Sequence, residues 1–179
     1  MIIKVHLEKT NKIRLKMTTK KNNFKLPKKR IPKILVPLDD SKCSIHALNS
    51  AINLAKFTDS KIVGIFVIPS DVSPLPLDEL FDPLSSIEPL GYKAKLTKHG
   101  QKILDHAEQI CVQNNIKFTK NILFGNPGRD IVSFAENKKN DIGLIVIGSR
   151  GHSRAGEMLL GSVSYTVVHK SKKPVMIIK

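Results

Sequence analysis

The sequence predicts a doubly wound α/β fold with five mainly parallel strands, and two observations support this prediction. Short continuous apolar runs recur along the chain, as expected of strands that are buried on both faces. Segments with an apolar stripe at helical spacing separate these runs, which indicates repeated βαβ units. Right-handed crossovers place the helices of such units on both faces of the sheet. Ligands bind such sheets beyond the carboxyl ends of the strands, where the strand order reverses.

The expected elements alternate regularly along the chain. Ser41 has the residue type and position of the N-cap of the first helix. Five prolines between residues 69 and 90 predict a long loop there. The predicted strands cover 34–38, 61–68, 116–124, 142–147 and 174–179. The predicted helices cover 41–57, 92–114, a stretch after the turn 125–128, and 162–171.

The positive charge of the chain is concentrated at its amino terminus. Residues 1–33 hold 12 Lys or Arg against one acid, Glu8, whereas residues 34–179 hold 18 against 14. We therefore divide the chain into a basic, flexible arm (1–32) and one folded domain (33–179). A solvated arm, or a true start at Met17, is the favoured interpretation. The alternative is an arm that contacts nucleic acid or an acidic surface.

Cysteine and hydropathy patterns indicate an ordinary intracellular domain. Cys43 and Cys111 lie far apart on helical patterns, which predicts two buried free thiols rather than a disulfide framework or zinc site. No apolar run is long enough for a transmembrane helix, and no signal peptide pattern is present. We therefore expect no membrane insertion and a cytoplasmic location.

The loop after the fourth predicted strand contains the most unusual chemistry. Gly148 ends a buried strand, where a missing Cβ lets a ligand approach the backbone. Gly151 allows the positive φ of a tight turn. Gly161 and Ser162 begin the next helix, whose unpaired amides and dipole attract phosphate. Glycine and serine also form ordinary turns, so none of these residues indicates a ligand by itself.

Common phosphate and nucleophile motifs are absent from this loop. The two glycines at 151 and 156 have the spacing of a P-loop, but Glu157 and Met158 stand where Lys and Ser or Thr are required. No GxGxxG follows the first strand, and no GxSxG nucleophile elbow is present. The sequence therefore predicts neither a P-loop nucleotidase nor a dinucleotide enzyme.

The glycine spacing resembles that of ATP-binding universal stress proteins. Gly148, Gly151 and the Gly161-Ser162 pair match the G-2x-G-9x-G-(S/T) pattern of that family. The segments 33–41, 124–127 and 172–178 resemble its first strand, its third strand-to-helix turn and its last strand. This resemblance spans residues 33–179. It implies a Rossmann-like, adenine nucleotide α hydrolase-like fold with strand order 3-2-1-4-5.

The resemblance also implies which residues bind the base. Asp39 would accept hydrogen bonds from the adenine or ribose side of the nucleotide. Pro37 and Leu38 would shape the adenine pocket, and Val67 would pack against the base. Asp40, beside Asp39, is interpreted as a solvated turn residue.

The sugar and phosphates are assigned in the same way. Gly148 and Gly151 would line the ribose and phosphate path, and Gly161, Ser162 and Val163 would hold the phosphates.

Charged residues near this pattern have two interpretations. Arg150, His152 and Arg154 could contact phosphate oxygens, or they could be solvated charges on an exposed flap. His99 and His106 are seven residues apart on one helix without a third ligand, so we interpret them as surface residues rather than as a metal site.

The resemblance implies a nucleotide-dependent sensor or regulator of a stress response that acts through an unidentified protein partner. No general base or Walker B pattern points to a strong ATPase, and no catalytic residue or protein metal site is predicted. Slow hydrolysis of ATP with Mg²⁺ or Mn²⁺ stays open. A homodimer paired through the C-terminal strand is also implied.

Two alternatives to this function remain. One is a related core that has lost nucleotide binding, with the basic arm as its working part. The other is an enzyme of the adenine nucleotide hydrolase type, although the sequence lacks the catalytic lysine motif of that class.

Overall fold

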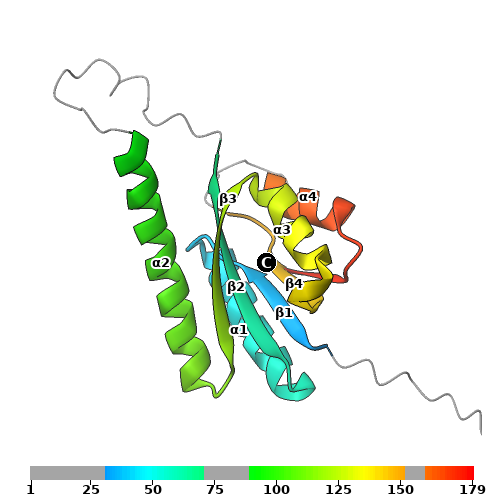
Figure 1. Ribbon diagram of the computed structural model, residues 1–179. Coiled ribbons are helices and arrows are strands. Elements are labelled where there is room, and N and C mark those ends of the chain that lie inside the picture. The colour runs from blue at the N-terminus through cyan, green and yellow to red at the C-terminus, as the bar shows by residue number, and fades with distance from the viewer. Residues whose placement is uncertain (1–30, 71–88, 152–159) are drawn as a thin grey trace, which may run out of the picture.

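The domain is built on a five-stranded parallel sheet. The computed structural model describes residues 31–70, 89–151 and 160–179. All strand pairs are parallel, and the order is β3-β2-β1-β4-β5, which confirms the predicted fold class and strand order (Figure 1). The strands are β1 (Lys33–Pro37), β2 (Lys61–Pro69), β3 (Phe118–Gly125), β4 (Ile142–Gly148) and β5 (Val175–Ile178).

Helices cover both faces of the sheet, as Figure 1 shows. One face is covered by α1 (Lys42–Thr58) and α2 (Pro89–Gln113), and the other by α3 (Pro127–Glu136) and α4 (Ser162–Lys170). A short 3₁₀ helix, Lys138–Asn140, precedes β4 and was not predicted from the sequence. Two apolar layers result, one on each side of the sheet.

Alternating strand residues supply these two layers. On β1, Ile34 and Val36 pack toward α1 and α2, whereas Leu35 packs toward α3 and α4; all three are fully buried. Cys111 is fully buried in the first layer, as predicted. Cys43 is only half-buried, so the prediction that both thiols are buried was wrong for this residue. It lies in the first turn of its helix, at the rim of the core.

The element ends differ from the sequence prediction by up to three residues. The helix expected from residue 92 begins at Pro89, because the first turn of a helix accepts proline without losing a hydrogen bond. The first strand ends at Pro37, so Leu38 follows it. Ser41 caps α1 as predicted, and its side chain accepts a hydrogen bond from the amide of Ser44.

Several segments singled out in the sequence lie outside the described residues. These are most of the basic arm (1–32), of which only Ile31 and Pro32 are described, and most of the proline-rich loop between residues 69 and 90. His152, Arg154 and Glu157 also lie outside the described residues. No helix in the described part of the chain has the length and hydropathy needed to cross a membrane.

Candidate functional site

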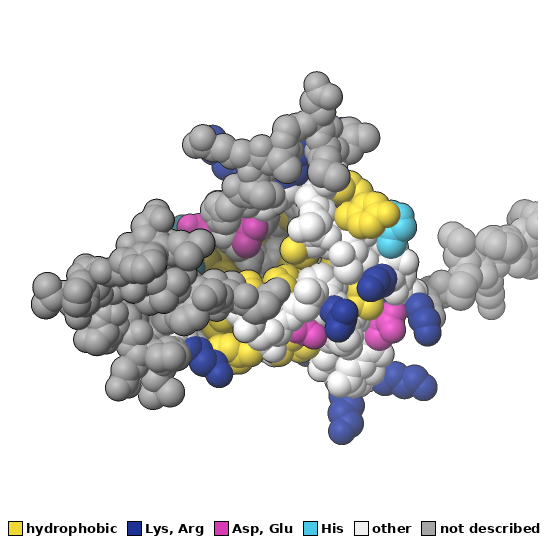
Figure 2. Space-filling model, turned by 90° about the horizontal axis from the view of Figure 1, so that it is seen from above, with side chains coloured by type: hydrophobic (Ala, Val, Ile, Leu, Met, Phe, Trp, Pro, Cys, Tyr) yellow, Lys and Arg dark blue, Asp and Glu magenta, His cyan; other side chains and the backbone are white. Residues whose placement is uncertain are grey.

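A cavity of about 390 Å³ lies at the carboxyl ends of the strands. It spans the point between β1 and β4 where the strand order reverses, which is where doubly wound sheets bind ligands. Figure 2 looks down on this end of the molecule and shows hydrophobic side chains within the hollow. The position and volume of the cavity suit a small organic ligand.

The structure brings all ten predicted site residues to this one cavity. They come from the ends of β1, β2 and β4 and from the beginning of α4, which are far apart in the sequence. The predicted residues that line the cavity are Pro37, Leu38, Asp39, Val67, Gly148, Arg150, Gly151, Gly161, Ser162 and Val163.

Asp39 places a carboxylate at the rim of an otherwise apolar slot. Its Oδ1 accepts hydrogen bonds from the backbone amide of Ser41 at 3.1 Å and from the Ser41 hydroxyl at 2.6 Å. The same hydroxyl accepts the amide of Ser44, so the N-cap of α1 and the orientation of Asp39 form one network. The apolar part of the slot includes Val67 and Ile131.

The glycines of the loop are explained differently from the sequence-based expectation. A Cβ at Gly148 would lie 2.7 Å from the carbonyl carbon of Cys43, so the packing of α1 against β4 requires this glycine. Gly151 does not adopt positive φ. Its Cβ would instead lie 2.5 Å from Oδ2 of Asp39, so glycine here makes room for the carboxylate. The conformational argument made from the sequence for Gly151 was therefore wrong.

The amino end of α4 differs from those of α1 and α3, which also meet the cavity. Ser41 caps α1 and the Asn126 side chain caps α3, whereas Gly161 caps α4 without a side-chain hydrogen bond. The cavity reaches this end, because Gly161, Ser162 and Val163 line it. The first amides of α4 are thus available to an anion, and the helix dipole favours one there.

Other cavity residues were missed by the sequence analysis. His99 was interpreted as a surface residue; it is indeed exposed, but it also lines the cavity. Its ring meets that of Phe66 edge-on, with centroids 6.1 Å apart. No sequence signal identified Phe66, because alternation along β2 puts it on the opposite face of the sheet from Val67. No sequence signal placed α2 over that strand. The further lining residues are Ser44, Ile65, Pro69, Pro127, Ile131, Ile147 and Ser164.

Protein metal ligands are not gathered at this site. Within the described segments, no group of three or more His, Cys, Asp or Glu side chains is arranged to bind a metal ion. The cavity therefore combines an apolar slot, one carboxylate and a helix amino end. These groups suit a flat apolar ring with polar edges that carries an anionic group.

Comparison with known proteins identifies the class of protein. The model of the universal stress protein family matches residues 30–179, and the chain belongs to this family. Among its relatives is universal stress protein MJ0531 of Methanocaldococcus jannaschii. It is 35% identical over 150 residues, covering 82% of this chain and 81% of the relative.

Solved structures share the fold. Universal stress protein UspA of Lactobacillus plantarum aligns with a TM-score of 0.68 at 24% identity, covering 84% of this chain and 99% of that one. A universal stress protein of Archaeoglobus fulgidus was solved in complex with dAMP and aligns with a TM-score of 0.56 at 21% identity, over 83% and 98% of the chains. A further universal stress protein structure, in complex with cAMP, aligns with a TM-score of 0.57 at 21% identity, covering 83% of this chain and 96% of that one.

Proposed function

We propose that this universal stress protein binds ATP in the cavity at the carboxyl ends of its strands and acts as a nucleotide-dependent regulator. The observation that carries the proposal is the convergence of ten residues, chosen from the sequence for this ligand, on one cavity. The complexes of two family members with dAMP and cAMP support an adenine nucleotide as the ligand.

The chemistry of the cavity suggests how the nucleotide lies. The base enters the apolar slot beside Val67, and Asp39 accepts a hydrogen bond from its polar edge or from the ribose. The phosphates extend along the backbone of Gly151 toward the uncapped amino end of α4, where Ser162 adds a hydroxyl. Arg150, which also lines the cavity, would add a positive charge.

Regulation fits this site better than rapid hydrolysis. Near the expected phosphates the described residues supply amides, a hydroxyl and the charge of Arg150, which hold an anion. Rapid hydrolysis needs, in addition to groups that hold the phosphates, a group that orients the attacking water. A divalent ion accompanying ATP would be bound mainly through the phosphates, because the described residues bring no set of metal ligands together. Regulation then passes through a protein partner that distinguishes the bound from the free state.

A glutamate at Ser162 tests the position of the phosphates. Ser162 is exposed in the first turn of α4, so an acid there stabilises the helix dipole by about 0.3–1 kcal/mol. It also repels phosphate. We therefore expect Ser162→Glu to melt at an unchanged or higher temperature but to bind ATP at least about tenfold more weakly by calorimetry. Ser133→Glu, on the exposed side of α3 and away from the cavity, is the matched control.

Either of two results would overturn the proposal. Equal ATP affinity in Ser162→Glu and wild type would show that the phosphates do not bind at the amino end of α4. Absence of binding by the folded wild-type chain would assign the protein to a branch of the family without nucleotide.

The proposal includes a homodimer formed through β5. This strand pairs with β4 on one side, and no other strand of the described residues pairs with its second edge. Met176 and Ile177 on it are 39% and 37% exposed, and apolar edges of this kind are normally paired or covered. Sedimentation of the full chain at micromolar concentration tests this: a dimer is expected, and a monomer would contradict it.

A further inference from the structure

The amino ends of the strands form a strongly basic surface, on the opposite side of the sheet from the cavity at their carboxyl ends. We call these two sides the amino edge and the carboxyl edge. Because all strands are parallel, the segments that precede them meet at this edge. The segments 31–33, 56–61, 113–117, 136–141 and 170–174 contain nine lysines and three acids. The remaining residues of 33–179 contain ten basic and eleven acidic residues. The positive charge of the domain is therefore concentrated at one edge.

Helix ends and acids compensate only part of this charge. The four α-helices of the described residues all end at this edge, and each carboxyl end carries about half a negative charge. The acids there are Asp59, Glu136 and Asp141. Together these groups balance about five of the nine lysines, so about four positive charges remain for a partner. Stabilisation of the helix carboxyl ends by these lysines therefore does not account for the positive charge that remains.

A polar groove of about 710 Å³ lies within this surface. Two turns form it, 55–61 between α1 and β2, and 113–117 between α2 and β3. Lys56, Lys61 and Lys117 line it together with the three consecutive amides of residues 113–115. Lys61 and Lys117 are neighbours across two strands, since the amide of Ile62 donates to the carbonyl of Lys117 at 2.9 Å.

The basic arm joins the domain beside this groove. The amide of Lys61 donates to the carbonyl of Pro32 at 3.2 Å, and the hydroxyl of Ser60 donates to the carbonyl of Ile31. Residues 1–30 add eleven basic residues and one acid to the sequence. Among the described residues, the end of the arm thus contacts Ser60 and Lys61, which both line the groove.

We propose that the groove binds single-stranded nucleic acid through its sugar–phosphate backbone. Lysines neutralise phosphates, and the side-chain amides of Gln113 and Asn115 can form hydrogen bonds with phosphate and sugar oxygens. The Asn114 amide instead holds the groove together, since it accepts a hydrogen bond from Lys56 Nζ at 2.7 Å and donates one to the carbonyl of Ile110 at 2.9 Å.

Phe57 does not line the groove, but it follows Lys56 in the last turn of α1 and is 89% exposed, so its aromatic face is open to stacking by a base. A concave polar groove fits an extended chain better than a lipid surface, which favours a broad apolar helix face. This inference goes beyond the proposed nucleotide binding and does not depend on it.

The test measures binding of the full chain to fluorescein-labelled oligothymidylate and oligouridylate. Oligomers of about 20 nucleotides exceed the usual footprint of a single-strand-binding groove. The triple variant Lys56→Gln, Lys61→Gln and Lys117→Gln removes the charges of the groove. We expect roughly tenfold weaker binding by fluorescence anisotropy, and a log–log salt slope that is shallower by about 2 between about 50 and 200 mM NaCl.

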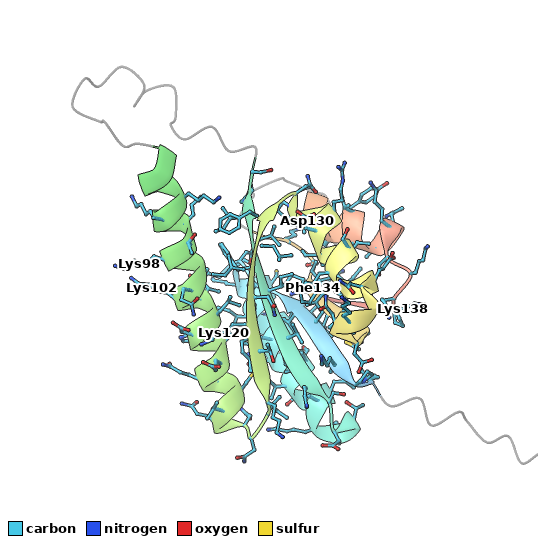
Figure 3. All side chains as sticks on the ribbon, in the orientation of Figure 1. Lys98, Lys102, Lys120, Asp130, Phe134 and Lys138 are labelled. Carbon is cyan, nitrogen blue, oxygen red and sulfur yellow. The ribbon has the colours of Figure 1, made fainter. Side chains whose placement is uncertain are left out.

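A matched variant controls for net charge. Lys95→Gln, Lys98→Gln and Lys102→Gln removes three exposed lysines from the first 14 residues of α2, at least about 16 Å along that helix from the groove. Figure 3 shows Lys98 and Lys102 on the side of α2 that faces away from the sheet. We expect this variant to bind the oligonucleotides within about twofold of wild type, because it leaves every proposed phosphate contact in place.

Several outcomes would overturn the proposal. One is absence of oligonucleotide binding by the wild type. Another is an equal loss in the two triple variants, which would indicate attraction by net charge alone. A third is unchanged affinity of the groove variant, which would assign binding to the arm. A fourth is binding to phosphatidylserine vesicles, but not to oligonucleotides, that the groove variant loses; this result would make the surface a membrane contact.

Discussion

The two edges of this sheet are built from different chemistry. The carboxyl edge holds an apolar cavity with glycines, one oriented carboxylate and the uncapped amino end of α4. The amino edge holds lysines, side-chain amides and turns. In these turns Asp59, Asn115 and Asp141 adopt the left-handed backbone conformation. In a parallel sheet every helix begins near one edge and ends near the other. The polarity of the chain alone therefore makes the first edge favourable to anions through helix dipoles.

The amino edge needs side-chain charge to attract an anion. Its helix ends are partly negative, so an anion binds there only when lysines outweigh them. On the two proposals, each edge binds an anion by a separate means: backbone amides at α4, and ammonium groups at the turns. The difference predicts selectivity. Oriented amides favour a compact phosphate group, whereas a row of lysines favours a polymer with repeated charges and a strong salt dependence.

The largest expected contrast is in the reactivity of the two cysteine thiols. Burial raises the pKa of the Cys111 thiol to about 12, with a further contribution from Glu108. At pH 8 its thiolate fraction is then about a thousandfold below that of an ordinary thiol. Cys43, near the carboxyl edge, is half-buried. We expect Ellman's reagent to modify one thiol at pH 8 in the folded protein and two in urea. A Cys43→Ser chain that still reacts when folded would contradict this.

Glycines near the two ends of β4 provide a second contrast. Gly148→Ala brings a Cβ within 2.7 Å of the α1 backbone at Cys43. At Gly143 the nearest atom, 2.9 Å away, is a ring carbon of Pro32, in the segment that leads into β1. We expect the free energy of unfolding in urea to fall by about 3 kcal/mol for Gly148→Ala and by about 1 kcal/mol for Gly143→Ala. Equal losses would indicate that Pro32 is held as firmly as α1.

The smallest expected effect is that of a substitution at one edge on ligand binding at the other. The cavity and the groove share no lining residue. We therefore expect the groove triple variant to bind ATP, and Ser162→Glu to bind oligonucleotide, each within about twofold of wild type; coupling energies between linked sites are typically larger, about 1–3 kcal/mol. Calorimetry and anisotropy on the same preparations measure this. A larger cross-effect would show that the edges communicate.

Local patterns were sufficient for most of the architecture. Apolar runs and, for the third strand, alternation identified the five strands of the described residues, and an apolar stripe at helical spacing identified the first three α-helices, because burial on one or both faces dictates those repeats. The N-cap at Ser41 was also predictable, since capping depends on neighbouring residues. Pro89 was misassigned because proline alone does not distinguish a loop from the first turn of a helix.

Contacts between distant elements were not accessible in this way. The requirement for glycine at 148 arises from the backbone of α1, more than a hundred residues earlier, and that at 151 from Asp39. His99 reaches the cavity because α2 crosses β2 with Gly100 against Phe66. Such approaches depend on how helices cross the sheet, which sequence periodicity does not encode.

The sequence by itself determined the order and type of the elements, and its glycine spacing selected one loop as the candidate site. The tertiary structure alone decided that ten residues from four segments line one cavity, and that scattered lysines share one edge. The physical reason is that periodicity reports burial of each segment separately. Strand order and register bring segments together, and they are set by packing between residues far apart in the chain.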